Sequence, residues 1–199
     1  MGFMLLKWKN NAGEHQKKGE IMFKEPRTEL LFSWSDLGDI EAGRPNLGTT
    51  THVAVYRLMQ YTMRDVLIKR YGPQTASQIL YDSGKSAGMS FCANVLDKNL
   101  VLDDFVANLQ DALKEFGVGI LRVEKVDLET NSFVLTVEED LDCSGLPMIN
   151  ETICDYDEGF IAGILEEYIG KPFNVNEIDC WATGDRVCRF EANQAVSEV

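Results

Sequence analysis

Two stretches near the C-terminus, residues 154–163 (CDYDEGFIAG) and residues 177–190 (EIDCWATGDRVCRF), decide how this chain folds. They contain three thiols and one carboxylate, in Cys154, Glu177, Cys180 and Cys188. Side chains of these types can fill all four positions of a tetrahedral zinc ion and leave none open. The two stretches therefore predict a closed metal site that staples structure and does not activate water.

The spacing of these residues can be compared with the geometry of a β-hairpin. Cys180 and Cys188 flank a turn signal at residues 183–185, and a hairpin loop there would place them opposite each other. Facing positions have Cβ atoms roughly 4.5–5.5 Å apart, close enough for both sulfurs to reach one ion. Glu177 would fall on the other face of a regular strand, so its participation requires a bulge near residues 178–179.

Two other interpretations of the cysteines are possible. Free cysteine is among the most buried residue types, so reduced core thiols would give the same pattern. Disulfides are disfavoured by the odd count of five cysteines and by the lack of an apolar segment that resembles a signal peptide. A reducing cytoplasm fits this composition better.

The same residues, with the glycines between them, resemble the zinc-binding part of the 4-vinyl reductase domain family. That family includes the sensor domains of phenol-responsive transcription activators and is structurally akin to Bet3-type subunits of vesicle-tethering complexes. A nitric-oxide sensing domain is a more distant structural relative. The resemblance is strong from about Cys143 to Phe190 and weaker from Arg44 to Asp142, and it does not cover residues 1–42.

The resemblance implies a structural zinc ion held by Cys154, Glu177, Cys180 and Cys188. Cys143 is an additional thiol near these residues and could replace Glu177. The resemblance also implies a small apolar-ligand pocket between the helices and the sheet. Aromatic residues that could line it, although they would equally suit a plain core, are Tyr56, Phe91, Phe105, Phe133, Phe160 and Trp181.

The phenol sensors of this family hold the phenol hydroxyl with a histidine and a tryptophan. This chain has no histidine after His52, so no phenol-binding histidine carries over. The same shortage disfavours haem, for which His52 is the one realistic axial ligand.

Length and charge limit the remaining possibilities. A chain of 199 residues that is 45% apolar can bury one substantial core, and we expect a partly mobile N-terminal arm over residues 1–42 and one domain over residues 43–199. A formal charge of −13 disfavours nucleic acid and anionic lipid as partners. No apolar stretch approaches the roughly 20 residues needed to span a membrane.

Hydrophobic periodicity and capping signals predict the secondary structure. Helices are expected over residues 52–70, from residue 73 through residue 87, and over residues 103–117 and 155–169. Strands are expected within residues 21–35 and over residues 119–127, 132–139, 174–181 and 187–192. Clustered helices followed by antiparallel hairpins predict an α+β fold, with the helices packed on one side of the sheet.

Residues 84–88 (GKSAG) match the G-x-S-x-G pattern of a hydrolase nucleophile, but they fall within a predicted helix and both histidines lie upstream. Gly84, Gly88, Gly159 and Gly163 are better explained as small residues that allow close approach to a neighbour, either the protein's own sheet or a second subunit. The acidic residues Glu151, Asp155, Asp157 and Glu158 are interpreted as surface charge at a helix N-terminus.

These observations predict a zinc-stabilised, dimeric, cytoplasmic protein that binds or senses a hydrocarbon or another small apolar molecule. It would act through a partner protein or as a ligand carrier, and no catalytic residues are assigned. One alternative is an accessory enzyme of tetrapyrrole vinyl reduction, and another is a tethering or assembly subunit.

Overall fold

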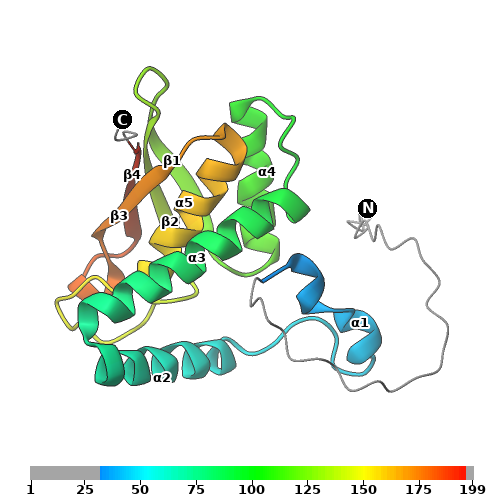
Figure 1. The fold of residues 1–199 in the computed structure, drawn as a ribbon, viewed down its shortest axis with the longest axis vertical. Coiled ribbons are helices and arrows are strands. Elements are labelled where there is room, and N and C mark those ends of the chain that lie inside the picture. The colour runs from blue at the N-terminus through cyan, green and yellow to red at the C-terminus, as the bar shows by residue number, and fades with distance from the viewer. Residues whose placement is uncertain (1–31, 196–199) are drawn as a thin grey trace. The chain divides into compact units, whose positions relative to one another are not determined.

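The computed structural model describes residues 32–195, which belong to a compact unit that begins at Phe32. Its sheet has four antiparallel strands in the order β1-β2-β4-β3 (Figure 1). The strands span Ile120–Asp127 (β1), Ser132–Glu138 (β2), Phe173–Asp179 (β3) and Cys188–Gln194 (β4). In β3 and β4 buried and exposed residues alternate, because successive side chains of a strand point to opposite faces.

The helices are Ile40–Gly43 (α1), Val53–Tyr71 (α2), Pro73–Val95 (α3), Leu102–Glu115 (α4) and Asp155–Ile169 (α5). Short 3-10 helices cover Trp34–Leu37 (η1) and Trp181–Thr183 (η2). Pro73 opens α3, where its missing N–H costs nothing. Gly170 ends α5 in the left-handed conformation, with φ at 76°.

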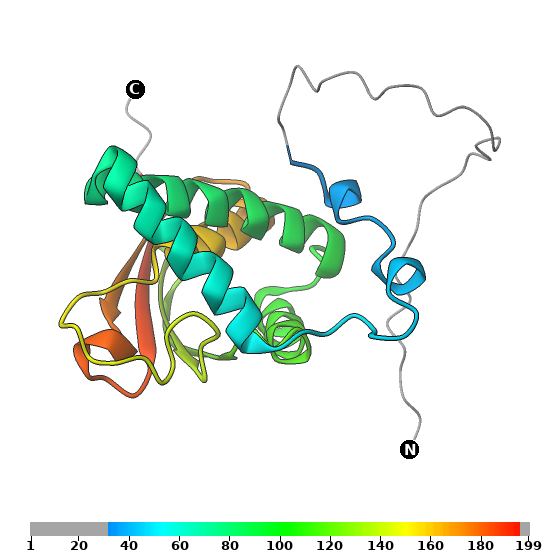
Figure 2. The ribbon, with the colours of Figure 1, turned by 90° about the horizontal axis from the view of Figure 1, so that it is seen from below.

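The elements are arranged in layers, with α5 lying between the sheet and α3 (Figure 2). Glycines make the contact between α3 and α5 possible. A Cβ atom on Gly84 would lie 2.0 Å from the carbonyl oxygen of Tyr156, and one on Gly159 would lie 1.9 Å from that of Tyr81. The predicted small-residue contact is therefore present, but it joins two helices of one chain and not a helix to the sheet.

The predicted α+β fold is confirmed, and most predicted elements match the observed ones within a few residues. The hairpin at the C-terminus differs from the prediction. Its strands are joined by a longer connection that contains η2, because Cys180 and Thr183 cap a helical turn where a three-residue loop was expected. Of the strand predicted within residues 21–35, only residues 32–35 are described, and they contain no strand. The remainder of that prediction and most of the predicted arm lie outside the described residues.

Helix α2 has an unusual polarity. Gln60 is its one buried residue, and the side that faces the body of the protein is polar. Its outward side carries large apolar residues that are exposed, namely Val55, Leu58, Met59, Met63 and Val66. These positions recur at intervals of three and four residues and form one stripe, which we call the α2 stripe. A helix normally buries such a stripe, so this one indicates a surface for association.

Candidate functional site

Four cysteines from separate segments meet in the interior. Cys143 lies in the loop after β2, Cys154 precedes α5, Cys180 precedes η2 and Cys188 begins β4. All four are buried, and their sulfur atoms lie within 4.8 Å of one another. The sulfur of Cys154 is 3.9 Å from those of Cys180 and Cys188, and the sulfurs of Cys143 and Cys188 are 2.9 Å apart. All are free thiols, so the cluster is a set of four soft ligands.

The arrangement of sulfurs fits a tetrahedral thiolate site. Zinc–sulfur bonds of about 2.3 Å place the four sulfurs about 3.8 Å apart. Two of the distances from Cys154 are close to that value, whereas Cys143 and Cys188 are closer and have to separate before the set becomes tetrahedral. The amide of Ala182 donates to the sulfur of Cys180 at 3.4 Å, an interaction that stabilises a thiolate. The donor set therefore suits zinc and no hard cation.

The thiols depend strongly on one another for their ionisation. Hydrogen bonds from neighbouring cysteines, first of all Cys143, lower the pKa of Cys180. Hydrogen bonds with the same neighbours, again led by Cys143, raise the pKa of Cys154. Because one thiolate is stabilised at the expense of the others, the four sulfurs ionise together only when a cation balances their charge.

Glu177 lies beside this cluster but is not one of the four grouped ligands. Its Oε2 atom accepts hydrogen bonds from the amides of Ile153 and Cys154, both at 3.2 Å. Its Oε1 atom is buried without a partner, and burial, together with the charge of Cys180, raises the pKa of Glu177 to about 8. The bulge predicted near residues 178–179 is confirmed by a register shift between Glu177 and Asp179. The carboxylate thus holds the backbone of one ligand, Cys154, in place.

The loop that carries Cys143 is held by α2. Arg57 donates to three carbonyl oxygens of this loop, those of Asp140, Leu141 and Ser144. The side chain of Asp142 accepts from Tyr56 at 2.7 Å and also from Gln60, and its carbonyl accepts from Tyr61 at 2.9 Å. The polar inner face of α2 is therefore explained, because it satisfies the backbone and the buried carboxylate of this loop.

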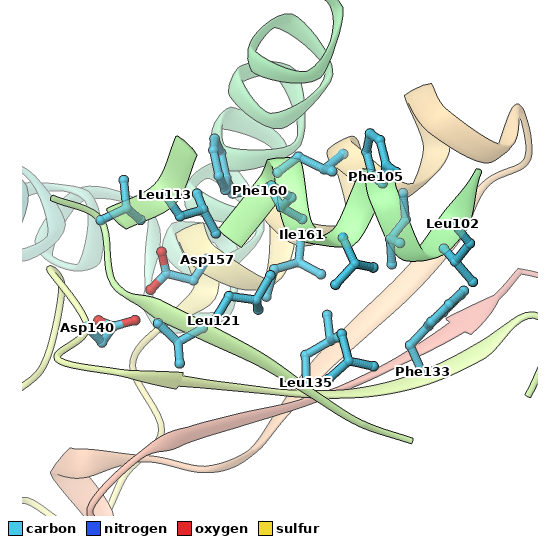
Figure 3. Close-up of a pocket in the computed structure, with 17 residues that line it drawn as sticks. Leu102, Phe105, Leu113, Leu121, Phe133, Leu135, Asp140, Asp157, Phe160 and Ile161 are labelled. Carbon is cyan, nitrogen blue, oxygen red and sulfur yellow. The ribbon is translucent and has the colours of Figure 1, made fainter. Parts of the chain in front are cut away.

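An apolar cavity lies between α4, α5 and the sheet (Figure 3). Fifteen apolar residues and two acidic residues line it, and its volume is about 50 Å³. Asp140 and Asp157 lie together at one end, with Leu102 and Phe133 toward the other (Figure 3). Typical ligand pockets have about 300–1,000 Å³, so this cavity admits only a slim molecule unless side chains move.

The structure places three of the six predicted pocket residues, Phe105, Phe133 and Phe160, in the wall of this cavity. The other three have different contacts. Tyr56 bonds to Asp142, Phe91 packs against Phe160 and Phe116, and Trp181 donates its indole N–H to Leu146.

The acidic end of the cavity touches the cysteine cluster. A carboxylate oxygen of Asp140, a carboxylate oxygen of Asp157 and the sulfur of Cys154 lie within 4.8 Å of one another. Burial, and after it the charge of Asp142, raises the pKa of Asp140 to about 7. Burial also raises the pKa of Asp157 well above its ordinary value, with the charges of Asp140 and Asp142 as further causes.

The interpretation of Asp157 as surface charge is therefore wrong, because the side chain is 9% exposed and faces the cavity. The first turn of α5 points one acidic residue inward while Asp155 pairs with Arg64 nearer the surface. Asp140 was not predicted as a site residue. Its one signal in the sequence is its place directly after a strand and three residues before Cys143, where Asp140 Oδ1 accepts from the Cys143 amide at 3.0 Å.

Helices packed on an antiparallel sheet, with a buried thiol cluster at the end of the last strand, define the class of this domain. Residues 133–194 match the model of the 4-vinyl reductase domain, which confirms the resemblance to that family. The chain is also similar to MJ0150, an uncharacterized protein of Methanocaldococcus jannaschii. The two are 28% identical over 155 residues, which cover 78% of this chain and 84% of the relative.

Solved structures support the same fold. A vinyl-4-reductase family protein from M. jannaschii matches with a TM-score of 0.53 and 18% identity over 75% of this chain and 85% of its own. The phenol-responsive sensory domain of the transcription activator PoxR, solved with phenol, gives 0.56 and 14% over 74% and 76%. Subunit 3 of a trafficking protein particle complex from Naegleria fowleri, covalently bound to palmitic acid, gives 0.59 and 14% over 72% and 95%.

No helix in the described part of the chain is both long enough and apolar enough to cross a membrane.

Proposed function

We propose that this protein is a zinc-stabilised module that binds or senses a small, mainly apolar molecule in the cavity between α4, α5 and the sheet. The observation that carries this proposal is the position of the cavity, whose acidic end lies against the cysteine cluster. The metal would fix the segments that form that end, while the apolar walls would hold the ligand. Its signal would pass to a partner protein, or the protein would carry the ligand itself.

The residues that hold zinc in this proposal are Cys143, Cys154, Cys180 and Cys188. Cys143 takes the place first assigned to Glu177, because its sulfur is grouped with the other three and the Glu177 carboxylate is already bonded to two amides. Four thiolates leave no open position, so the ion supplies stability and no catalysis. Thiolate ligands require a reducing compartment, which favours the cytoplasm.

A substitution that fills the cavity tests the binding function. Val106 is a partly buried cavity residue on α4, and Val106→Phe adds a ring that competes with a ligand for the same space. We expect this variant to bind 1-hexanol, a slim apolar probe, at least tenfold more weakly than the wild-type protein, a difference of about 1.4 kcal/mol. Ligand-observed NMR titration measures this difference.

The matched control is Val126→Phe, which makes the same change at an exposed position of β1 outside the cavity. It should leave hexanol binding unchanged. If both variants bind hexanol like the wild-type protein, or if the wild-type protein does not bind it, the cavity is not a ligand site and the proposal is rejected.

We also propose that two copies of the chain associate through the α2 stripe. Two such helices can pack antiparallel, so that each covers the other's apolar residues and their dipoles oppose. A second copy suits this surface because the stripe itself carries no acidic residue, although the whole chain has a formal charge of −13. Burying five exposed apolar side chains on each copy favours such a pair.

Met59→Glu should therefore convert a dimer into a monomer, because it buries an unpaired charge at the centre of the stripe. Size-exclusion chromatography with light scattering measures the change from two chains to one. Met148→Glu, at a 72% exposed position in another loop, should leave the dimer intact. A wild-type protein that runs as a single chain at micromolar concentration would contradict the proposal.

A further inference from the structure

We propose that the acidic end of the cavity recognises a cationic head group, so that the ligand is a slim primary alkylamine in its ammonium form. This inference rests on the proposed function, because it assumes that the cavity holds a ligand. It assigns a chemical class to that ligand from two features, an unpartnered buried carboxylate oxygen and the charge around it.

The first feature is the Oδ2 atom of Asp157. This atom is buried and has no hydrogen-bond partner in the protein, although its residue is nine-tenths buried and lines the cavity. A buried polar atom without a partner costs about 1–3 kcal/mol, and more when it is charged. A donor at the head of a bound molecule removes that cost. The apolar walls of the cavity supply no such donor.

The second feature is the sign of the surrounding charge. Asp140 lies beside Asp157, and the sulfur of Cys154 lies within 4.8 Å of a carboxylate oxygen of each. Within residues 32–195, no Lys or Arg side chain forms an ion pair with either aspartate. Arg57 is close, but its hydrogen bonds go to carbonyl oxygens of the loop. Acceptors and negative charge therefore dominate this end.

An alkylammonium group complements these features. It provides three N–H donors and one positive charge, and it stays protonated near neutral pH as the lysine side chain does, with a pKa of about 10.4. Hydrogen bonds between ammonium and carboxylate are among the stronger ones in proteins. A fatty acid would bring a third carboxylate to the same place and be repelled. An alcohol offers one donor without the charge.

A second metal ion is a less suitable occupant. The two carboxylates and the sulfur of Cys154 give it three ligands, while the cavity beyond them is lined by apolar residues. Magnesium and calcium require six or more oxygen ligands, which these walls do not provide. Cys154 already belongs to the four-cysteine set. The small volume of about 50 Å³ further favours an unbranched chain attached to the head group.

The test compares three six-carbon probes on the full-length, metal-loaded protein, namely hexylamine, 1-hexanol and hexanoate. We expect hexylamine to bind at least tenfold more tightly than hexanol, and hexanoate more weakly than either. Ligand-observed NMR and calorimetric titration give the three dissociation constants. This comparison needs only the wild-type protein and therefore does not depend on how any variant folds.

Asp157→Asn then removes the charge with little change in size. The variant should lose the preference for hexylamine, so that the amine and the alcohol bind within about twofold of each other. Asp111→Asn on the exposed side of α4 makes the same change in net charge and should keep the preference. Metal content and thermal unfolding of each variant confirm that the zinc site remains.

The possible results separate the two proposals. If hexanol or hexanoate binds the wild-type protein as tightly as hexylamine, the inference on the head group is wrong while the binding function stands. If none of the probes binds, the binding function fails and the inference fails with it. If the wild-type protein carries a second metal equivalent that Asp157→Asn removes, the acidic end is a metal site and the amine is excluded.

Discussion

Cys180→Ser is expected to remove the bound zinc and to destabilise the fold by about 4 kcal/mol or more. The thiolate of Cys180 is one of four ligands from four segments, so its loss frees the loop after β2, the start of α5 and the hairpin together. The free energy of binding a structural zinc ion is spent on the fold, and a chain that cannot bind it loses that contribution. Elemental mass spectrometry and denaturant unfolding measure the two effects.

Cys92→Ala is the matched control for this prediction. Cys92 is also fully buried and free, but it lies in α3 among core residues and not in the four-cysteine group. Its removal should cost about 1–2 kcal/mol for a lost sulfur contact and leave one zinc per chain. Should Cys180→Ser retain full stability, or should the wild-type protein fold stably without metal, the cysteines are core residues and zinc has no structural role.

Gly159→Ala is the second change with a large expected effect, and we expect it to cost more than about 3 kcal/mol. A Cβ atom there would lie 1.9 Å from the carbonyl oxygen of Tyr81 and 2.8 Å from the amide nitrogen of Lys85, both in α3. Backbone atoms cannot rotate away as side chains can, so α3 and α5 must move apart. Such a shift would loosen the whole layer above the sheet. Thermal and chemical unfolding give the magnitude.

Gly43→Ala provides a comparison in which the same methyl group meets no atom within 4 Å. There the substitution should be neutral or slightly stabilising, because it only restricts the unfolded chain. Equal effects at the two positions would show that helix propensity, and not the contact between α3 and α5, explains the glycines.

The choice of metal ligands shows how far sequence spacing can be used. The positions of Cys154, Cys180 and Cys188 were predicted from spacing and resemblance, and the bulge that Glu177 requires was predicted from strand geometry and is present. Glu177 was nevertheless given the fourth position, because spacing along β3 brings it near the cysteines. Cys143 is 11 residues before Cys154 in an irregular loop, and no periodicity describes where such a loop turns.

The acidic end of the cavity shows the opposite difficulty. Asp157 shares the first turn of α5 with two other acids, and in sequence all three look like solvent-exposed compensation of the helix dipole. Which of them faces inward depends on how α5 is rotated against the sheet and α4. Asp140 was missed because its role depends on Asp157, a residue 17 positions later in the chain that meets it only in the folded state.

The sequence by itself determined the local elements, the α+β class, the glycine contact and three of the thiols that gather at one site. These follow from interactions between near neighbours, whose periodicity and capping are written in short segments. Only the tertiary structure decided that Cys143 completes the thiol cluster, that α2 turns its apolar side outward and that two carboxylates close the cavity. Each of these depends on packing between distant segments, which local patterns do not encode.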